Sequence, residues 1–351
     1  MERISKKVIY VGGIAIGGNH PVTIQSMCNT LTQDIEKTVT QINQLTEAGC
    51  QIIRVAVPNM EAAQAISEIK KQISIPIIAD IHFDYRLAIE SIKSGVDALR
   101  LNPGNIGSEN NVKAVIDHAK ERKIPIRIGV NSGSLQKDKL EKYGVCTQAI
   151  VESALEHVSI LEKLNYEEIK ISVKASSVPL TIDSYRLLSS KCPYPLHLGV
   201  TESGTEFTGT IKSSIGIGTL LAEGIGDTIR VSLTDDPMKE IYVAKQILKS
   251  LGLRKGLEIV SCPTCGRTQI DLINLAKQVE IALKPYEEKE ITVAVMGCEV
   301  NGPGEAREAD FGIAGGKGLG LIFQKGEIIK KVDEKELLNE LIALIEKHYS
   351  N

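Results

Sequence analysis

The sequence predicts an α/β protein in which an N-terminal (β/α)8 TIM-type barrel precedes a smaller C-terminal α/β domain. Three observations lead to this prediction. The chain has 351 residues, which favours two domains or one large barrel with an appendage. Short β-branched runs alternate with longer helical stretches from residue 22 to residue 233. Beyond residue 251 this alternation stops, and cysteines and glycines become frequent.

Eight short apolar runs, each followed by a helical pattern, predict the barrel. Strands that alternate with helices are typical of parallel βαβ units with right-handed crossovers. The eight predicted strands are residues 22–27, 51–57, 76–81, 97–102, 126–131, 169–174, 196–201 and 228–233. An open doubly wound sheet would have the same order of elements and is the structural alternative.

Helical segments between these runs carry apolar residues at three- and four-residue spacing. Residues 34–49, 60–73 and 147–164 are examples. Gly49 and Gly95 stand where two of the helices should stop, because glycine readily adopts the left-handed conformation at a helix end.

The division into domains follows from the change of pattern. We expect the barrel to comprise residues 1–250, a linker residues 251–256, and the second domain residues 257–351. Within the second domain, strands are predicted over 258–262 and 291–297, helices over 268–283 and 334–348, and a glycine-rich stretch over 301–320.

Two glycine-rich segments, 216–218 and 312–320, invite comparison with nucleotide-binding loops. The second fails the P-loop pattern because Phe311 stands at its first glycine position and Gly318 follows the Gly-Lys pair. The first has Leu221 where a dinucleotide loop needs its third glycine. Both segments are therefore predicted to be turns.

Composition and charge exclude several classes of protein. The formal net charge is −3, which argues against a global nucleic-acid or membrane field but leaves room for a local basic site. No run of 18 apolar residues occurs, and the first residues lack the apolar core of a secretory signal. Seven scattered cysteines are poor material for a disulfide framework. The sequence predicts a cytoplasmic protein with reduced thiols.

Polar residues stand at the C-terminal ends of the predicted strands, where TIM barrels build their active sites. They are Arg54, Asp80, His82, Arg100, Asn102, Arg127, Asn131, Lys174, Thr201, Glu202, Arg230 and Ser232. Five of the eight strands contribute a cation, and such a ring is costly to bury unless an anion neutralises it. Guanidinium groups suit bidentate phosphate contacts, so we expect a phosphorylated, multiply charged small substrate. Pairing of each cation with a local carboxylate is the alternative.

Two of these residues have further interpretations. Glu202 could donate or accept a proton, or it could only balance the neighbouring cations. His82 could contact a ligand, or it could be a structural histidine.

Three cysteines predict a metal centre in the second domain. Cys262 and Cys265 form a C-x2-C motif after one strand, and Cys298 ends the next long strand. Three thiolates fit an iron–sulfur cluster or a structural zinc, and a redox-active dithiol is a further alternative. Zinc normally takes a fourth Cys or His, but the only histidine in this domain is His348 in the last helix.

A carboxylate is the natural candidate for the fourth ligand. Glu299, Glu305 and Glu308 are close in sequence, and Glu305 directly follows the turn at 301–304, which could fold it back towards Cys298. An oxygen ligand on iron is exchangeable, so a substrate could displace it, whereas four thiolates favour plain electron transfer.

The motifs together resemble one enzyme family. QSMCNT (25–30), ADIHFDY (79–85), LRLNPGNIG (99–107), HLGVTESG (197–204), SCPTCGR (261–267) and MGCEVNGPGEA (296–306) are similar to motifs of the 4-hydroxy-3-methylbut-2-enyl diphosphate synthase family of the methylerythritol phosphate pathway of isoprene biosynthesis. The resemblance covers essentially the whole chain and is to the two-domain bacterial form.

The resemblance implies an oxidoreductase that opens the ring of 2-C-methyl-D-erythritol 2,4-cyclodiphosphate and dehydrates it with two electrons. It implies a [4Fe-4S] cluster on Cys262, Cys265, Cys298 and Glu305. The strand-end residues named above, together with Asn301 near the cluster, are implied as substrate contacts, and Glu202 is implied as the acid or base. Ferredoxin or flavodoxin is implied as the electron donor, and a homodimer in which the cluster domain of one subunit closes over the barrel of the other.

Two other functions fit parts of the pattern. One is a barrel lyase or aldolase in which Lys174 forms a Schiff base and the second domain binds structural zinc. The other is a non-catalytic iron–sulfur carrier or scaffold.

Overall fold

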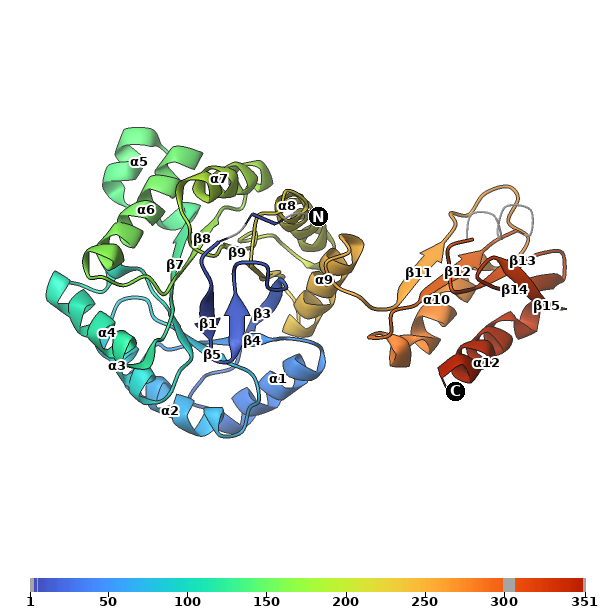
Figure 1. Ribbon diagram of the computed structural model, residues 1–351, viewed down its shortest axis with the longest axis horizontal. Coiled ribbons are helices and arrows are strands. Elements are labelled where there is room, and N and C mark those ends of the chain that lie inside the picture. Colours follow the sequence, from blue (N-terminus) through green and yellow to red (C-terminus); the bar gives the residue numbers. More distant parts are fainter. Residues whose placement is uncertain (1–2, 5, 299–306, 350–351) are drawn as a thin grey trace. The chain divides into compact units, whose positions relative to one another are not determined.

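The computed structural model describes residues 3–4, 6–298 and 307–349. The chain divides into two compact units, Met1–Leu253 and Arg254–Asn351. Each unit has its own sheet and its own hydrophobic core (Figure 1). No helix in the described part of the chain has the length and apolar character that a membrane span requires.

The first unit is the predicted (β/α)8 barrel. Its strands are β3 (Thr23–Met27), β4 (Ile52–Ala56), β5 (Ile77–Asp80), β6 (Ala98–Arg100), β7 (Ile126–Asn131), β8 (Ile169–Lys174), β9 (His197–Leu198) and β10 (Thr228–Ile229). They pair in parallel in the order β8-β7-β6-β5-β4-β3-β10-β9. A parallel bridge between Ile171 and Leu196 joins the two end strands, so the barrel prediction is confirmed over the open sheet.

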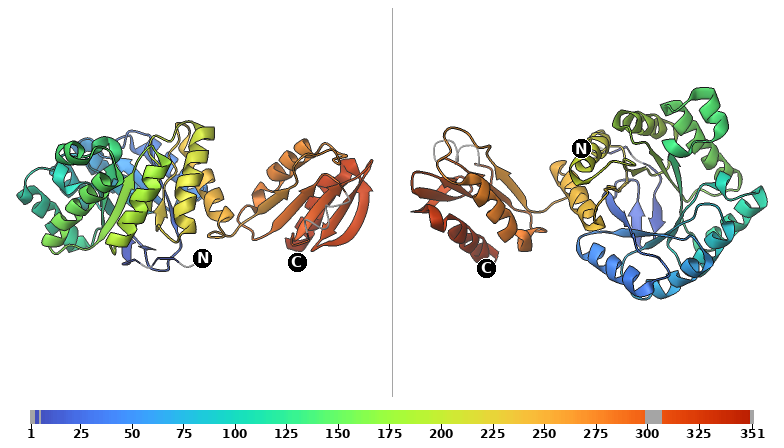
Figure 2. Two further views of the ribbon diagram at one scale, coloured as in Figure 1. Left: turned by 90° about the horizontal axis from the view of Figure 1, so that it is seen from above. Right: turned by 180° about the vertical axis from the view of Figure 1, so that it is seen from behind.

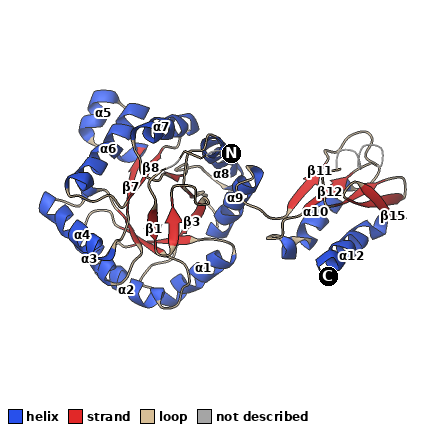
Figure 3. Cartoon of the chain, in the orientation of Figure 1, coloured by secondary structure: helices blue, strands red, loops and turns tan. Residues whose placement is uncertain are grey.

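A ring of helices surrounds the strands (Figure 3). The helices are α1 (Ile35–Glu47), α2 (Met60–Lys70), α3 (Tyr85–Lys93), α4 (Glu109–Arg122), α5 (Lys137–Tyr143), α6 (Thr147–Lys163), α7 (Val178–Lys191), α8 (Glu206–Ala222) and α9 (Pro237–Ser250). Their apolar faces bury Ile, Leu, Val and Ala side chains against the barrel in one continuous core.

Local sequence sets the ends of these helices. The side chain of Asp34 accepts a hydrogen bond from the Lys37 N–H at the start of α1, which satisfies one of the free donors there. Gly49 and Gly95 follow the ends of α1 and α3 with φ of +108° and +91°. The predicted glycine stops are therefore confirmed.

An N-terminal hairpin closes one end of the barrel. Its strands β1 (Ile9–Val11) and β2 (Ile14–Ile16) pair antiparallel. Ile9, Val11 and Ile16 pack in one cluster with residues at the N-terminal ends of β4, β5 and β6. The strands are only three residues long, and the sequence prediction did not include them.

The second unit is a five-stranded sheet with two helices on one face (Figure 2). Its elements are β11 (Glu258–Ser261), α10 (Leu272–Ala282), β12 (Thr292–Met296), β13 (Phe311–Gly315), β14 (Leu319–Gln324), β15 (Glu327–Asp333) and α12 (Leu337–Tyr349). Strands β11, β12 and β13 are parallel, whereas β14 pairs antiparallel with both β13 and β15.

The prediction of turns at the two glycine-rich segments was wrong except at residues 316–318, which connect β13 to β14. Residues 312–320 belong mostly to β13 and β14, and residues 216–218 lie inside α8. Close packing explains these glycines. A Cβ on Gly312 would lie 2.2 Å from the Phe323 ring, and one on Gly216 would lie 2.7 Å from Val200.

Candidate active site and candidate metal centre

A polar cavity of about 170 Å³ opens among the C-terminal ends of the barrel strands. It is lined by Arg54, Asp80, His82, Arg100, Arg127, Gly129, Asn131, Ser172, Lys174, Thr201, Arg230 and Ser232. Ten of the strand-end residues singled out from the sequence therefore meet at one place. Strand alternation brings them together, because residues two apart point to the same side of a strand and every strand runs the same way.

Asp80 is the carboxylate among the cavity's lining residues. Its Oδ1 accepts a hydrogen bond from the Arg100 Nη1 at 3.3 Å, and its Oδ2 lies 3.7 Å from the Arg54 Nε. The His82 Nε2 lies 3.8 Å from the same Oδ2. Burial by itself would raise the pKa of Asp80, but Arg54 and Arg100 outweigh it and the pKa is lowered. Asp80 is thus held as an anion between arginines.

The cations of the cavity are buried close to one another. Burial and the neighbouring arginines lower the pKa of Arg54 to about 10, although Asp80 acts in the opposite direction. Burial lowers the pKa of Arg127 and that of Lys174 well below their usual ranges, and nearby arginines add to both effects. Charge repulsion is therefore built into the site before any ligand binds.

Glu240 on α9 is the second carboxylate of the site, and the sequence did not indicate it. Its Oε2 lies 3.6 Å from the Arg230 Nε, and its Oε1 accepts a hydrogen bond from the Leu233 N–H at 3.0 Å. Two carboxylates thus face five cations, an excess of three positive charges when Lys174 is protonated and of two when it is neutral. The cavity has the electrostatics of a site for a multiply charged anion.

Met27 is another residue that the sequence did not indicate. Its Sδ accepts from the Arg54 Nη2 at 2.9 Å and from the Arg230 Nη1 at 3.5 Å. A thioether is a weak, uncharged acceptor, so it orients the two guanidinium groups without neutralising them.

Asn102 lies beside the cavity but is not among its lining residues. Its Nδ2 donates to the Gly129 carbonyl at 2.8 Å, and its Oδ1 accepts from the Gly129 N–H at 2.9 Å. The Arg100 Nη2 donates to the same carbonyl at 3.2 Å. The Asn102 amide therefore holds the backbone between β6 and β7.

Glu202 follows Thr201, which lines the cavity, but its own side chain is exposed and does not line it. Its φ is +51°, in the left-handed region that non-glycine residues seldom adopt. Strained backbone of this kind tends to occur at functional sites. His82 is the most open of the ion-paired residues at the cavity, with its side chain 62% exposed.

The candidate metal centre lies at one edge of the second sheet. Ser261 pairs with Val295 in the parallel ladder of β11 and β12, so Cys262 and Cys298 follow the same ends of adjacent strands. The Cys262 Sγ accepts a hydrogen bond from the Gly297 N–H at 3.2 Å. Such N–H donors commonly surround cluster thiolates. Cys265 is exposed, and hydrogen bonds from Arg267 and Thr268 lower its pKa.

These thiols do not form a closed site by themselves. Over residues 3–4, 6–298 and 307–349, no three His, Cys, Asp or Glu side chains lie close enough together to hold a metal ion. The fourth predicted ligand, Glu305, and the predicted substrate contact Asn301 lie outside the described residues. The donor chemistry at this edge fits an iron–sulfur cluster, because three thiols adjoin it and one already accepts an N–H.

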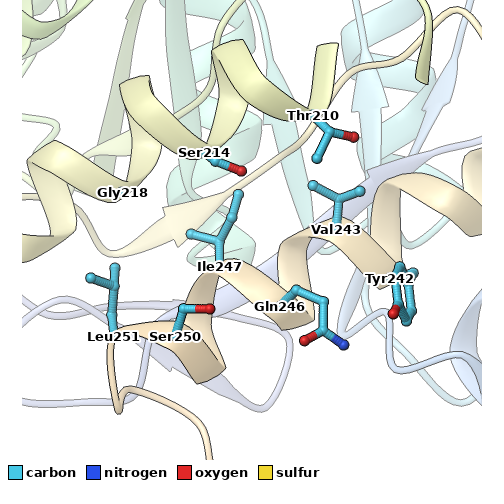
Figure 4. A pocket seen from close by; sticks show the side chains of 9 residues that line it. All are labelled: Thr210, Ser214, Gly218, Tyr242, Val243, Gln246, Ile247, Ser250 and Leu251. Carbon is cyan, nitrogen blue, oxygen red and sulfur yellow. The ribbon is translucent and has the colours of Figure 1, made fainter. Parts of the chain in front are cut away.

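A further hollow, of about 230 Å³, lies between α8 and α9 on the outside of the barrel (Figure 4). None of its nine lining residues is charged; they include Thr210, Tyr242 and Ile247. It therefore offers no charged side chain with which to balance an anionic ligand.

The first unit is a parallel barrel with a cationic cavity at the C-terminal ends of its strands. The second is a separate α/β unit that carries three cysteines. Together they define a two-domain TIM-barrel enzyme. Family models agree with this division. Residues 6–245 match the GcpE TIM-barrel domain, and residues 258–347 match the GcpE protein C-terminal domain. The chain belongs to the GcpE family.

Curated relatives match over the full length. The chain is 62% identical over 348 residues to a protein of Clostridium acetobutylicum, covering 99% of each chain. It is 64% identical over 348 residues to one of Clostridium perfringens, again covering 99% of each. Both relatives are called 4-hydroxy-3-methylbut-2-en-1-yl diphosphate synthase (flavodoxin).

Among solved structures, the barrel resembles 3-dehydroquinate dehydratase of Geobacillus kaustophilus. The TM-score is 0.51 and the identity 15%, covering 71% of this chain and 99% of that one. Dihydropteroate synthase of Yersinia pestis gives a TM-score of 0.50 at 13% identity, covering 70% and 98%. These likenesses concern the barrel fold alone.

Proposed function

We propose that this protein converts 2-C-methyl-D-erythritol 2,4-cyclodiphosphate to 4-hydroxy-3-methylbut-2-enyl diphosphate in isoprene biosynthesis. The observation that carries the proposal is the cavity lined by five cations and one carboxylate, Asp80, with a second carboxylate, Glu240, paired to Arg230 beside it. A cyclic diphosphate supplies two negative charges in a compact ring, which suits both the charge excess and the small volume. The names of the full-length relatives support the same reaction.

The overall reaction balances with two electrons and one proton. The bond between the tertiary carbon and its phosphate oxygen breaks, the neighbouring hydroxyl leaves as water, and a carbon–carbon double bond forms. Arg54, Arg127 and Arg230 would bind the diphosphate and stabilise the charge that develops on the released oxygen. Glu202 is the proposed group that moves the proton at its carboxylate, since it adjoins the cavity-lining Thr201.

We assign the electron-transfer group to a [4Fe-4S] cluster on Cys262, Cys265, Cys298 and Glu305. When bound, the cluster would supply the two electrons one at a time. The donor would be flavodoxin or ferredoxin, and the word flavodoxin in the relatives' names supports the first. Three cysteines follow the strand ends of the second sheet. The Cys262 Sγ accepts a hydrogen bond, and the pKa of Cys265 is lowered. These features favour a metal-binding role over acid–base chemistry.

We further propose a homodimer in which the cluster domain of one subunit covers the barrel mouth of the other. Leu31, Phe83 and Phe207 follow β3, β5 and β9 around the mouth, and their side chains are 69%, 74% and 77% exposed. Large apolar residues exposed at this end of the barrel favour an interaction surface there. A cytoplasmic location is consistent with the reduced state of the described cysteines.

Anaerobic purification of the full-length protein tests the proposal. We expect a brown protein with about four iron and four sulfide per chain. It should turn over the cyclodiphosphate when given a strong reductant. Colourless protein with one zinc would instead favour a lyase in which Lys174 forms a Schiff base.

Two sets of variants separate the remaining alternatives. Arg54→Ala and Arg127→Ala should lose affinity for the cyclodiphosphate, whereas a mere cluster carrier would bind no diphosphate in any form. Glu305→Gln should lose most of its turnover. Full turnover in that variant would remove the exchangeable carboxylate from the proposal.

A further inference from the structure

A polar layer lies directly beneath the cavity, inside the barrel. Ser172 and Lys174 of β8 line the cavity, and Lys170 lies two residues earlier on the same inward-facing side of the strand. Lys170 is only 1% exposed. It pairs in register with Arg127 of β7, which reaches up into the cavity. Barrel interiors are normally filled by branched apolar residues, so a lysine in this layer needs an explanation.

Several polar atoms of this layer lack a hydrogen-bond partner in the described part of the chain. They are the Lys170 Nζ, the His197 Nε2 and both side-chain polar atoms of Gln25. All three side chains are at least 99% buried. The other ring nitrogen of His197 lies 2.8 Å from the Thr228 Oγ1, so the imidazole is fixed in place. Buried polar groups without partners are costly, and a charged ammonium without one is the costliest.

The charges that face Lys170 are mostly of its own sign. Arg127 comes from β7 and Arg54 from β4. His197 of β9 also faces this interior, but burial and the nearby cations lower its pKa well below its usual value, so its imidazole is uncharged. Lys174 follows on the same strand. Besides burial, Arg127 and Arg54 also lower the pKa of Lys174, so the buried cations of this interior repel one another.

One carboxylate, that of Asp227 just before β10, acts on Lys170 in the opposite direction. Asp227 is already engaged, however. It accepts hydrogen bonds from the Leu196 N–H and from the Arg3 Nη2, both at 2.7 Å. Burial first, and Arg127 next, lower the pKa of Lys170 to about 7.

We propose that at pH 8 Lys170 is mostly an uncharged amine in the ligand-free protein and takes up a proton from solvent when a diphosphate occupies the cavity above it. One N–H bond forms on Nζ, and no other bond changes. The ammonium then offsets the ligand's charge from below. The identity of the ligand rests on the proposed function, whereas the proton uptake rests on the polar layer itself.

The physical reason is linkage. An anion above the layer stabilises the protonated amine, so its pKa rises on binding. A raised pKa in the bound state means that affinity is complete below the pKa of the free state and is lost as the pH rises through that of the bound state. At pH 8, binding should therefore take up about one proton, and above neutrality affinity should fall by up to about tenfold per pH unit.

Calorimetric titration measures this uptake directly. The cluster-loaded full-length protein, without reductant, is titrated with the cyclodiphosphate at pH 8 in two buffers of different ionisation enthalpy. Each phosphorus of this ligand carries one strongly acidic oxygen, so the ligand itself does not titrate near neutrality. We expect Lys170→Met and Lys170→Gln each to take up about one proton fewer than the wild type, whatever Lys174 contributes to all three proteins. The dependence of Kd on pH should flatten in both variants.

Lys245 provides a matched control. It is a second buried lysine, 4% exposed, on α9 outside the barrel, where its chain packs on Gly49. Lys245→Met should leave the uptake unchanged. Equal uptake in the wild type and in both Lys170 variants would overturn the proposal, and so would the absence of uptake in the wild type.

Inorganic pyrophosphate separates this inference from the proposed function. Pyrophosphate titrates near neutrality, but the difference between wild type and Lys170→Met removes its own contribution. Lys170-dependent uptake with pyrophosphate, in a protein that does not bind the cyclodiphosphate, would uphold the proton uptake and refute the proposed substrate. Binding of both ligands without Lys170-dependent proton uptake would refute the proton uptake and leave the proposed substrate standing.

Discussion

Asn102 and Gly129 are joined by two reciprocal hydrogen bonds, of 2.8 and 2.9 Å, at the rim of the barrel. A side-chain amide here replaces the backbone partner that a longer strand β6 would have provided. The same Gly129 carbonyl also receives Arg100, so the amide and a cavity cation share one acceptor.

Asn102→Ala should destabilise the barrel by about 1–3 kcal/mol, because the buried Gly129 N–H loses its acceptor while the carbonyl keeps Arg100. Urea unfolding followed by circular dichroism, with separate transitions fitted for the two units, measures the effect. Asn105→Ala is the control, since Asn105 is exposed in the next turn and should change stability by less than about 0.5 kcal/mol. Equal effects of the two variants would contradict the role assigned to Asn102.

Gly199→Ala should disturb the cavity. A Cβ on Gly199 would lie 2.5 Å from the Lys174 Nζ and 2.7 Å from the Arg230 carbonyl, so both the lysine and the neighbouring strand must move. We expect the affinity for the cyclodiphosphate to fall at least about tenfold, or about 1.4 kcal/mol.

Gly218→Ala is the matched control for this substitution. Gly218 lies in α8 at the outer hollow of Figure 4, and a Cβ there meets no atom within 4 Å. Alanine is the better helix former, so this variant should gain about 0.5–1 kcal/mol of stability and keep its affinity. Unchanged binding in Gly199→Ala would show that Lys174 need not hold its present position.

Asp80→Asn should destabilise the barrel at neutral pH by about 3–5 kcal/mol, because Arg54 and Arg100 lose their buried counter-charge. The pKa of Asp80 is lowered in the folded protein, so its contribution is complete above the unfolded-state pKa and is lost as the pH falls through the folded-state value. Urea midpoints measured from pH 7 down to about pH 3 should therefore converge for the two proteins. A difference that stays constant over this range would exclude the ion pairs as its source.

Cysteine alkylation should distinguish the metal centre from the buried thiols. In protein stripped of metal under anaerobic conditions, the exposed Cys265 should react first with iodoacetamide. Burial raises the pKa of both Cys28 and Cys50 to about 12, so only about one thiol in ten thousand is ionised at pH 8 and both should stay unmodified.

Loading the cluster should protect Cys262, Cys265 and Cys298 together, as peptide mass spectrometry would detect. Labelling of any one of the three in the loaded protein would remove that cysteine from the ligand set. This measurement does not depend on turnover.

The part of the site that lies on strands could be predicted because its geometry is repetitive. Once the strands are placed, alternation determines which side chains meet at the rim, and Lys174 and Arg230 follow without knowledge of long-range contacts. The same rule would have found Ser172, two residues before Lys174, had every inward position been considered.

The residues that the sequence did not indicate make their contacts with elements that are distant in the sequence. Glu240 reaches Arg230 from a helix, and no local pattern distinguishes it from a solvent-facing glutamate. Most of β13 and the start of β14 were predicted to be turns, because glycines such as Gly312 and Gly320 are required by neighbouring side chains and not by the local backbone. Tertiary packing determines the role of Glu240 and the positions of these glycines, and tertiary packing cannot be deduced from a single sequence.

The N-terminal hairpin has a consequence for turnover. Ile9, Val11 and Ile16 close the barrel at the N-terminal ends of its strands, so the cavity opens only at the C-terminal ends of the described strands. Substrate, product and water must therefore enter and leave the cavity at the C-terminal ends of the strands. In the proposed dimer, a cluster domain that covers this opening during chemistry would have to move away to release product in every cycle, so the rate of that movement would limit turnover.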